Sequence, residues 1–267
     1  MKTQLLRLGS VVLHGVGGPE AGAINLIYSV LLHEYNQDMY SYIGINQIGN
    51  DLDELIMKEP NRRIYINIRY PSYNDFEKKS VIEQNRIRLD VVHQSLLRIA
   101  KEDDKLDVEK LIMIKNKILE NNFLFDFVYK TYVNKKDESL VAKVIIHPLV
   151  TRFDIYVLIE QNGQAKCKKM IYSGGTDDYY FAALFAYGMW HNTNRFVVSG
   201  KEKEMEIHID IEKCSVEYVN SSGYHNKAPF FELMKKHRSE KESDKAYEDW
   251  LHSLPPAVAA IINQGDN

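Results

Sequence analysis

Cysteine, proline and tryptophan are scarce in this chain. Its 267 residues include two cysteines, seven prolines and two tryptophans. Two cysteines cannot build the disulfide framework of a small secreted domain, and Cys167 and Cys214 do not form a CxxC pair. Because both fall in strand-like segments, we expect them to be reduced core residues of a cytoplasmic protein. A chain of this length buries roughly 70–75% of its unfolded surface, so it needs no such covalent support.

The sequence also lacks long apolar runs and a strong net charge. Its longest apolar run, residues 181–190, is far shorter than the ~20 residues that cross a bilayer. The first ten residues, "MKTQLLRLGS", lack the apolar core of a signal peptide. A formal charge of −3 and a pI near 6.3 argue against nucleic-acid binding, which usually requires a basic surface. We therefore expect a cytoplasmic protein that binds no membrane.

Isoleucine, asparagine, lysine and tyrosine are plentiful instead, a mix typical of AT-rich bacterial genomes. The seventeen tyrosines have two possible explanations. Tyrosine is enriched at binding surfaces, because it combines a large apolar ring with a polar tip. Strands also favour tyrosine for its fit to a half-buried pleated surface. The composition leaves both explanations open.

The first part of the chain, residues 1–120, alternates strand-like and helix-like patterns. We expect strands at 4–14, 39–48 and 62–70, where apolar residues alternate or run together. Apolar residues at helical spacing predict helices at 24–35, 51–58, 82–100 and 108–118. The spacing places Val108, Leu111, Ile112, Lys115 and Ile118 on one stripe of the last of these helices. Together these patterns predict a mixed α/β region.

The remaining residues, 121–267, begin with a strand-rich stretch. Successive strands up to about residue 220, with a hairpin turn at "QNGQ", predict an antiparallel β-meander. We expect one long strand at 203–219, a helix inserted from Thr176 to Trp190, and a helical C-terminal tail over 227–254. The predicted fold class is therefore α+β, as two domains, 1–120 and 121–267, or as one single domain.

The sequence "HGVGG" at residues 14–18 joins a strand to a helix and is the most suggestive motif. A P-loop would need a lysine and a hydroxyl residue after the last glycine, but Ala23 and Ile24 occupy those positions. A dinucleotide fingerprint would have a third glycine at the position of Glu20. An oxyanion loop of the α/β-hydrolase kind requires a GxSxG nucleophile elbow, and the sequence contains none.

A tight turn is the better interpretation of this loop, because glycines allow positive φ and close strand–helix packing. The alternative is an anion or oxyanion site at a helix N-terminus. Its candidate ligand-binding residues are His14, Gly15, Gly17 and Gly18.

No other group of residues forms a complete catalytic, cofactor or metal motif, so we predict none of these. "HEYNQ" at His33 has Gln37 where HExxH needs its second histidine. His208 and Asp210 share a strand face, but that face is rich in carboxylates and is typical of a solvated surface. We expect His93 to be a packing residue, and we expect paired carboxylates such as Asp103 and Asp104 to cap helices.

These observations favour a non-catalytic cytoplasmic protein that binds another macromolecule. One specific version is a bacterial immunity-type protein that inhibits a toxin; it rests on analogy with a class of proteins. The alternative is an enzyme or small-ligand-binding protein that uses the loop from His14 to Gly18. A homo-oligomer is also compatible with the sequence.

Overall fold

The chain divides into two compact units. The computed structural model describes residues 10–14, 21–48, 53–69, 76–150, 152–174, 185, 187–200 and 205–220. These residues fall into a first unit within 1–130 and 145–154, and a second unit within 131–144 and 155–267. The expected domain boundary near residue 120 stays a prediction.

Four strands and three helices make up most of the first unit. The strands are β1 (Val11–His14), β2 (Tyr42–Ile48), β3 (Ile56–Glu59) and β4 (Arg63–Arg69). The helices are α1 (Gly22–Glu34), α2 (Val81–Glu102) and α3 (Val108–Glu120), and a short 3-10 helix, η2, spans Phe76–Lys78. The predicted strands and the three longer helices are thus confirmed where the structure describes them.

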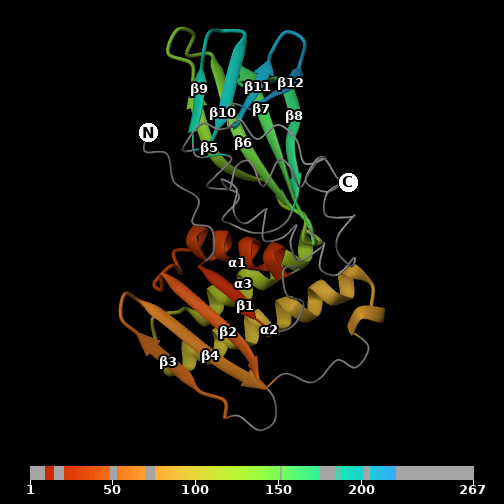
Figure 1. The fold of residues 1–267 in the computed structure, drawn as a ribbon. Helices are drawn as coiled ribbons and strands as arrows, with labels where there is room; N and C mark the ends of the chain where they lie inside the picture. The colour runs from red at the N-terminus through yellow and green to blue at the C-terminus, as the bar shows by residue number, and fades with distance from the viewer. Residues whose placement is uncertain are drawn as a thin grey trace, which may run out of the picture. The chain divides into compact units, whose positions relative to one another are not determined.

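The four strands form one sheet in the order β1-β2-β4-β3 (Figure 1). β1 pairs with β2, and β2 with β4, in parallel, whereas β3 runs antiparallel to β4. β1 lies at the edge of the sheet, and α1 satisfies two of its backbone N–H groups. The N–H of Val11 donates to Ser29 Oγ at 3.0 Å, and that of Leu13 donates to Asn25 Oδ1 at 3.2 Å. These bonds cover the strand edge.

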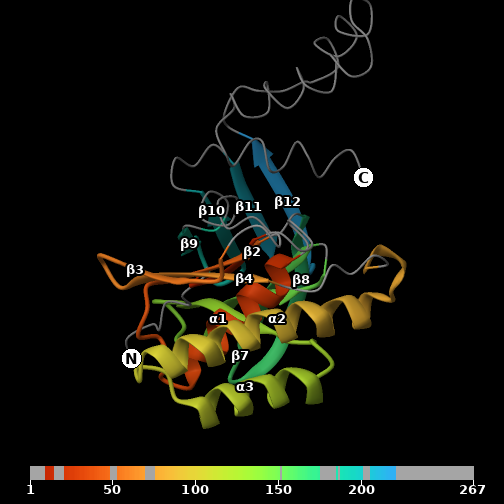
Figure 2. The ribbon, with the colours of Figure 1, turned by 90° about the horizontal axis from the view of Figure 1, so that it is seen from below.

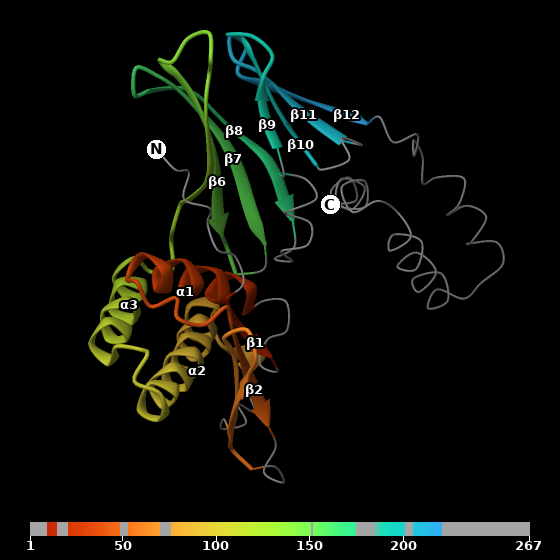
Figure 3. The ribbon, with the colours of Figure 1, turned by 90° about the vertical axis from the view of Figure 1, so that its left-hand side faces the viewer.

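The three helices lie on one side of this sheet, so the first unit has two layers (Figure 3). α2 and α3 run side by side (Figure 2). α1 is apolar nearly all round and buries most of its residues, because it contacts β1 as well as α2 and α3. The core of the first unit contains Ile24, Ile27, Leu31, Ile43, Ile45, Ile64, Ile66, Leu89, Val92, Leu96, Leu111, Ile114 and Ile118.

Two local predictions for this unit are wrong. The expected helix at 51–58 is replaced by the strand β3, because an edge strand can pair with β4 although most of its side chains are exposed. The predicted stripe of α3 is also displaced, since Val108 and Ile112 are 42% and 44% exposed. Ile114, which was not on that stripe, is buried instead.

The carboxylate of Asp103 links three segments of the first unit. It accepts hydrogen bonds from Tyr40 Oη at 2.6 Å and from Lys105 Nζ at 3.1 Å, and it pairs with Lys58 of β3 at 3.0 Å. The Tyr40 hydrogen bond, followed by the two lysines, holds the pKa of Asp103 well below its usual range. The prediction that Asp103 caps the start of a helix is wrong, because Asp103 follows the end of α2. Asp107 caps the start of α3 instead.

A buried hydrogen bond joins α1 to α2. Tyr28 Oη lies 2.9 Å from His93 Nδ1, and both residues are almost completely buried. The predicted packing role of His93 agrees with this position. Burial lowers the pKa of His93 from its ordinary 6.5 to about 4, because the imidazolium would lose its hydration.

The protonation of His93 makes the stability of the protein depend on pH. Between pH 6.5 and about 4 the unfolded chain binds a proton at His93 that the folded chain excludes. The free energy of unfolding therefore decreases as the pH falls through this window. We expect His93→Gln to reduce this decrease, as measured by urea unfolding above and below the window. His191→Gln, which changes an exposed histidine, is the control; an identical pH dependence in all three proteins would contradict the assignment.

Eight further strands form two more sheets. The first, in the order β5-β6-β7-β8, comprises β5 (Phe127–Val133), β6 (Leu140–Pro148), β7 (Phe153–Gln161) and β8 (Gln164–Gly174). The second, in the order β12-β11-β10-β9, comprises β9 (Tyr187–Trp190), β10 (Arg195–Ser199), β11 (Met205–Asp210) and β12 (Ser215–Asn220). The predicted turn at "QNGQ" is confirmed, since Asn162 and Gly163 adopt positive φ between β7 and β8.

The predicted fold class is wrong in its balance of helix and strand. The described residues contain three sheets and only three α-helices, all of them before residue 121. The strand-rich region forms two sheets where we expected one meander, and the long strand at 203–219 is the hairpin of β11 and β12. Residues 187–190 form the strand β9, where we expected the end of the inserted helix. The predicted C-terminal helices lie outside the described residues. No described helix is long and apolar enough to cross a membrane.

An aromatic cluster and a disulfide connect the two sheets within the second unit. Phe196 of β10 packs against Trp190 and against Tyr132 of β5, with ring centroids 5.2 and 5.4 Å apart. Cys167 of β8 is bonded to Cys214 in the turn between β11 and β12. The expectation of two reduced cysteines is therefore wrong. Folding brings together thiols that lie 47 positions apart in the sequence.

The disulfide should stabilise the second unit. It closes a loop of 47 residues, and removing such a link typically costs about 2–4 kcal/mol. We expect this loss for the double variant Cys167→Ser/Cys214→Ser, measured by denaturant unfolding against the wild type. Maleimide labelling of wild-type protein denatured without reductant provides the check on the bond itself. Two labelled thiols per chain in that experiment would show that the bond is absent.

Candidate functional site

Strands β2 and β4 have two chemically different faces. Five of their isoleucines, Ile43, Ile45, Ile64, Ile66 and Ile68, are buried on the helix side. The alternate residues point to the opposite side, because successive side chains of a strand alternate. Paired across the two strands are Tyr42 with Arg63, Gly44 with Tyr65, and Asn46 with Asn67. We call the face made by His14, Tyr42, Gly44, Asn46, Arg63, Tyr65 and Asn67 the open face.

No described helix of the first unit covers the open face, and its side chains are partly or fully exposed. In Figure 3, α1, α2 and α3 lie on the other side of the sheet. Among the described elements of the first unit, helices therefore pack on one face of the sheet only.

Two tyrosines and an arginine form the centre of the open face. The rings of Tyr42 and Tyr65 lie 5.5 Å apart. The guanidinium of Arg63 lies 5.1 Å from the centre of the Tyr42 ring and 5.6 Å from that of Tyr65. Arg63 Nη2 also donates to Tyr65 Oη at 2.6 Å. These contacts hold the two rings and the cation in one arrangement, which lowers the entropy that a binding partner must remove.

Burial and the neighbouring Tyr65 raise the pKa of Tyr42, while Arg63 acts in the opposite direction. Tyr42 therefore keeps its proton at neutral pH and remains a hydrogen-bond donor. His14 Nε2 lies 3.1 Å from Tyr42 Oη. This histidine is exposed and stands at the carboxyl end of β1. It is a polar extension of the aromatic centre.

Two asparagines form a hydrogen-bonded pair beside the tyrosines. Asn46 Nδ2 donates to Asn67 Oδ1 at 3.0 Å. The side-chain amide N–H groups of Asn67 and the carbonyl oxygen of Asn46 make no hydrogen bond with described residues. The pair can therefore offer a donor and an acceptor to a ligand, which is the usual use of a polar group at an interface.

The glycine-loop residues are only partly placed. Among the four predicted ligand-binding residues, His14 belongs to the open face, whereas Gly15, Gly17 and Gly18 lie outside the described residues. Sequence reasoning did not identify Tyr42, Arg63 and Tyr65 as a site. The alternation within "YIGIN" and "RIYINIR" is the signal, because isoleucine stands at 43 and 45 and at 64, 66 and 68, with tyrosine, glycine, asparagine or arginine at the positions between.

The other sequence candidates do not converge on a catalytic or metal site in the described part of the chain. No group of three histidine, cysteine, aspartate or glutamate side chains there could hold a metal ion. His208 pairs with Glu206 at 2.8 Å, and His33 pairs with Asp38 at 3.0 Å. The exposed lysines of the edge strand β8 include Lys168, whose ammonium lies 4.8 Å from the centre of the Tyr156 ring. Charged side chains on an edge strand are typical of edge protection.

Comparison with known proteins gives no relative for this chain: no protein family, curated protein or solved structure matches it. The open face must therefore be interpreted from its own chemistry.

Gly44 gives the two tyrosine rings the space they occupy. A Cβ at this position would lie 2.6 Å from Tyr65 Cδ1 and 3.0 Å from Tyr42 Cε1. We expect Gly44→Ala to displace the rings and to cost about 1–3 kcal/mol of stability. The same change should cost less in a Tyr65→Ala background, because the obstructing ring is gone. A double-mutant cycle from denaturant unfolding measures this coupling, and additive effects would contradict it.

Proposed function

We propose that the protein is a non-catalytic binding protein that holds another protein on the open face. The observation that carries the proposal is the cluster of Tyr42, Arg63 and Tyr65 on a sheet face that no described helix covers. Tyrosine and arginine are the residue types that most often dominate the energy of protein–protein interfaces. Held in place by mutual contacts, they lose little freedom on binding.

The charge on this face indicates what the partner supplies. Arg63 is exposed and donates only to Tyr65 among the described residues, so its other N–H groups can bind a carboxylate. The asparagine pair adds a donor and an acceptor at one side of the rings. These features favour a protein surface with an aspartate or glutamate flanked by apolar side chains.

The more specific version of this function, a bacterial immunity-type inhibitor of a toxin, remains a proposal by analogy with a class of proteins. It adds one expectation: the partner should be toxic to its host unless this chain is present. The Cys167–Cys214 disulfide favours an oxidising compartment over the expected cytoplasmic location, because such bonds are typical of oxidising compartments.

Affinity capture followed by binding measurements tests the proposal. The tagged protein is used to capture a partner from its native lysate, and the purified partner is then titrated by calorimetry. We expect Tyr65→Ala and Arg63→Ala each to weaken binding by about tenfold or more, as for residues at the centre of an interface. Circular dichroism checks that both variants keep their fold.

The matched controls are Tyr187→Ala and Arg86→Ala, which remove exposed residues of the same two types from β9 and α2. They should bind the partner like the wild type. Full-strength binding by the two open-face variants would exclude this face as the site. Capture that a nuclease abolishes would instead identify a nucleic acid as the ligand and contradict the proposal.

A further inference from the structure

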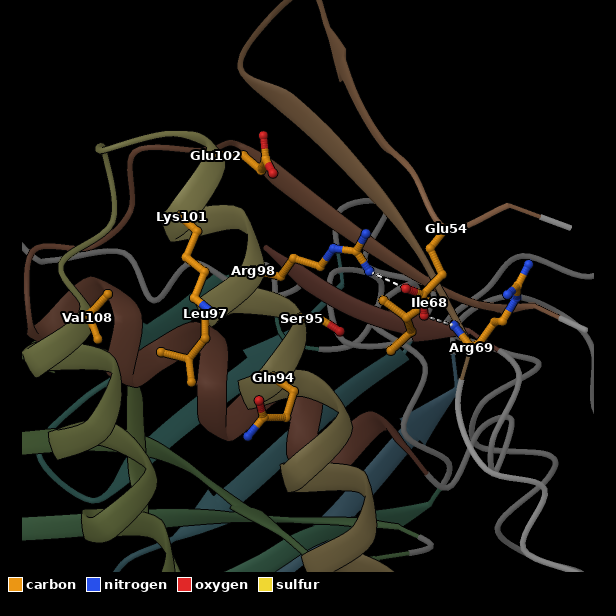
Figure 4. A pocket seen from close by; sticks show the side chains of 10 residues that line it. All are labelled: Glu54, Ile68, Arg69, Gln94, Ser95, Leu97, Arg98, Lys101, Glu102 and Val108. Carbon is orange, nitrogen blue, oxygen red and sulfur yellow. Dashed lines mark hydrogen bonds and ion pairs between the residues drawn. The ribbon is translucent and has the colours of Figure 1, made fainter. Parts of the chain in front are cut away.

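A pocket lies on the helix side of the sheet in the first unit, at the carboxyl end of β4 (Figure 4). Its volume is about 610 Å³, which is in the usual range for small-molecule sites, roughly 300–1,000 Å³. Open α/β sheets bind ligands at the carboxyl ends of their parallel strands. The pocket is at such an end but on the opposite side of the sheet from the open face.

One face of α2 forms the wall of this pocket. Gln94, Leu97, Arg98 and Lys101 recur at the helical spacing that places residues on one side of a helix. Figure 4 shows Arg98 extending from this helix toward Glu54, and Leu97 and Lys101 on adjacent turns. The wall therefore combines an apolar side chain with two cations.

Apolar surface comes from two further elements. Ile68 of β4 and Val108 of α3 line the pocket together with Leu97. Val108 is 42% exposed although it is apolar. A ligand with an apolar body would remove such surface from water, which is the usual driving force for occupying a pocket of this kind.

Three cationic side chains and two carboxylates, Glu54 and Glu102, line the pocket, and Glu54 lies between Arg98 and the backbone of Arg69. One of its carboxylate oxygens accepts the backbone N–H of Arg69 at 2.6 Å, and the other accepts Arg98 Nη1. These hydrogen bonds lower the pKa of Glu54, so the carboxylate is ionised at neutral pH. The chain thus places its own anion where a backbone donor and a guanidinium meet.

Additional polar groups in the pocket remain available. Lys101 and Gln94 form no hydrogen bond or ion pair with the described residues, and both side chains are exposed. Lys101 lies one helical turn beyond Arg98, on the same face of α2. A second anion bound at this wall could therefore contact both cations.

We infer that this pocket binds a small organic anion, an apolar ring or short chain with one phosphate or carboxylate group that takes the place of Glu54 on Arg98. The apolar body lies against Leu97, Ile68 and Val108, and Lys101 adds a second positive charge to the anionic group. Glu54 competes with the ligand, so its carboxylate sets the affinity of the site. The inference uses only residues of the first unit and does not depend on the function proposed for the open face.

Phenyl phosphate is a suitable probe, since it combines an apolar ring with one phosphate. Titration into the full chain, followed by the amide chemical shifts of residues 94–101, reports both affinity and location. We expect a Kd below about 1 mM for the wild type. Arg98→Gln should weaken binding about tenfold, because it removes a charge-assisted hydrogen bond. Glu54→Gln should tighten binding roughly fivefold, because it removes the competing carboxylate.

Three comparisons make the test decisive. Arg86→Gln changes an exposed arginine of the same helix and should leave the affinity unchanged. Lys101→Gln should weaken binding without disturbing the Glu54–Arg98 pair, which covers the case in which Arg98→Gln fails to fold. Inorganic phosphate and benzyl alcohol, each lacking one half of the probe, should bind more weakly than phenyl phosphate.

The inference is overturned if wild-type amides at 94–101 do not shift with phenyl phosphate. It is also overturned if Glu54→Gln weakens binding, because Glu54 would then belong to the ligand's partners and not to its competitors. Equal binding of inorganic phosphate would show that the apolar wall contributes nothing and would overturn the assignment of an organic anion.

Discussion

The alternation of side chains along β2 and β4 is the constraint on which the first unit depends. These two strands are the inner pair of the sheet, and their parallel register aligns isoleucines on one side and tyrosine, arginine and asparagine on the other. A slip by one residue would turn the isoleucines toward water and the polar residues toward the helices. The helix layer, the open face and the pocket beside α2 all require this register.

Buried polar contacts then hold the helices in position on the apolar side. The N–H groups of the edge strand β1 are bound by side chains of α1, and Tyr28 of α1 is bound to His93 of α2. Asp103 joins the end of α2 to β3 and to Tyr40. Each of these groups would be costly to bury alone, so each contact favours one arrangement of the layers over its alternatives.

The two faces of the sheet offer different chemistry for the same reason. The open face has rigid aromatic rings and a cation in an exposed position, which suits a large flat partner. The pocket has an apolar wall and cations around an internal carboxylate, which suits a small anion. In the second unit, stability comes from different sources, namely an aromatic cluster and a disulfide between two sheets.

Local sequence patterns were sufficient to predict the helices and strands in which buried residues recur at regular spacing. The helix α1, the strands β2 and β4, and the turn at Asn162 and Gly163 follow directly from apolar spacing and from residues that tolerate positive φ. The strand β3 was missed because an exposed edge strand has no apolar period and forms only when β4 is there to pair with it.

The sites depended on contacts between distant residues. Tyr42 and Tyr65 lie 23 positions apart and meet only through the register of β2 and β4, and Glu54 meets Arg98 across 44 positions. The pairing of Cys167 with Cys214 likewise depends on how two sheets are joined. The sequence by itself determined where chain segments bury apolar surface, because that preference is local. Only the tertiary structure decided which polar side chains face one another, because strand register and helix packing bring them together.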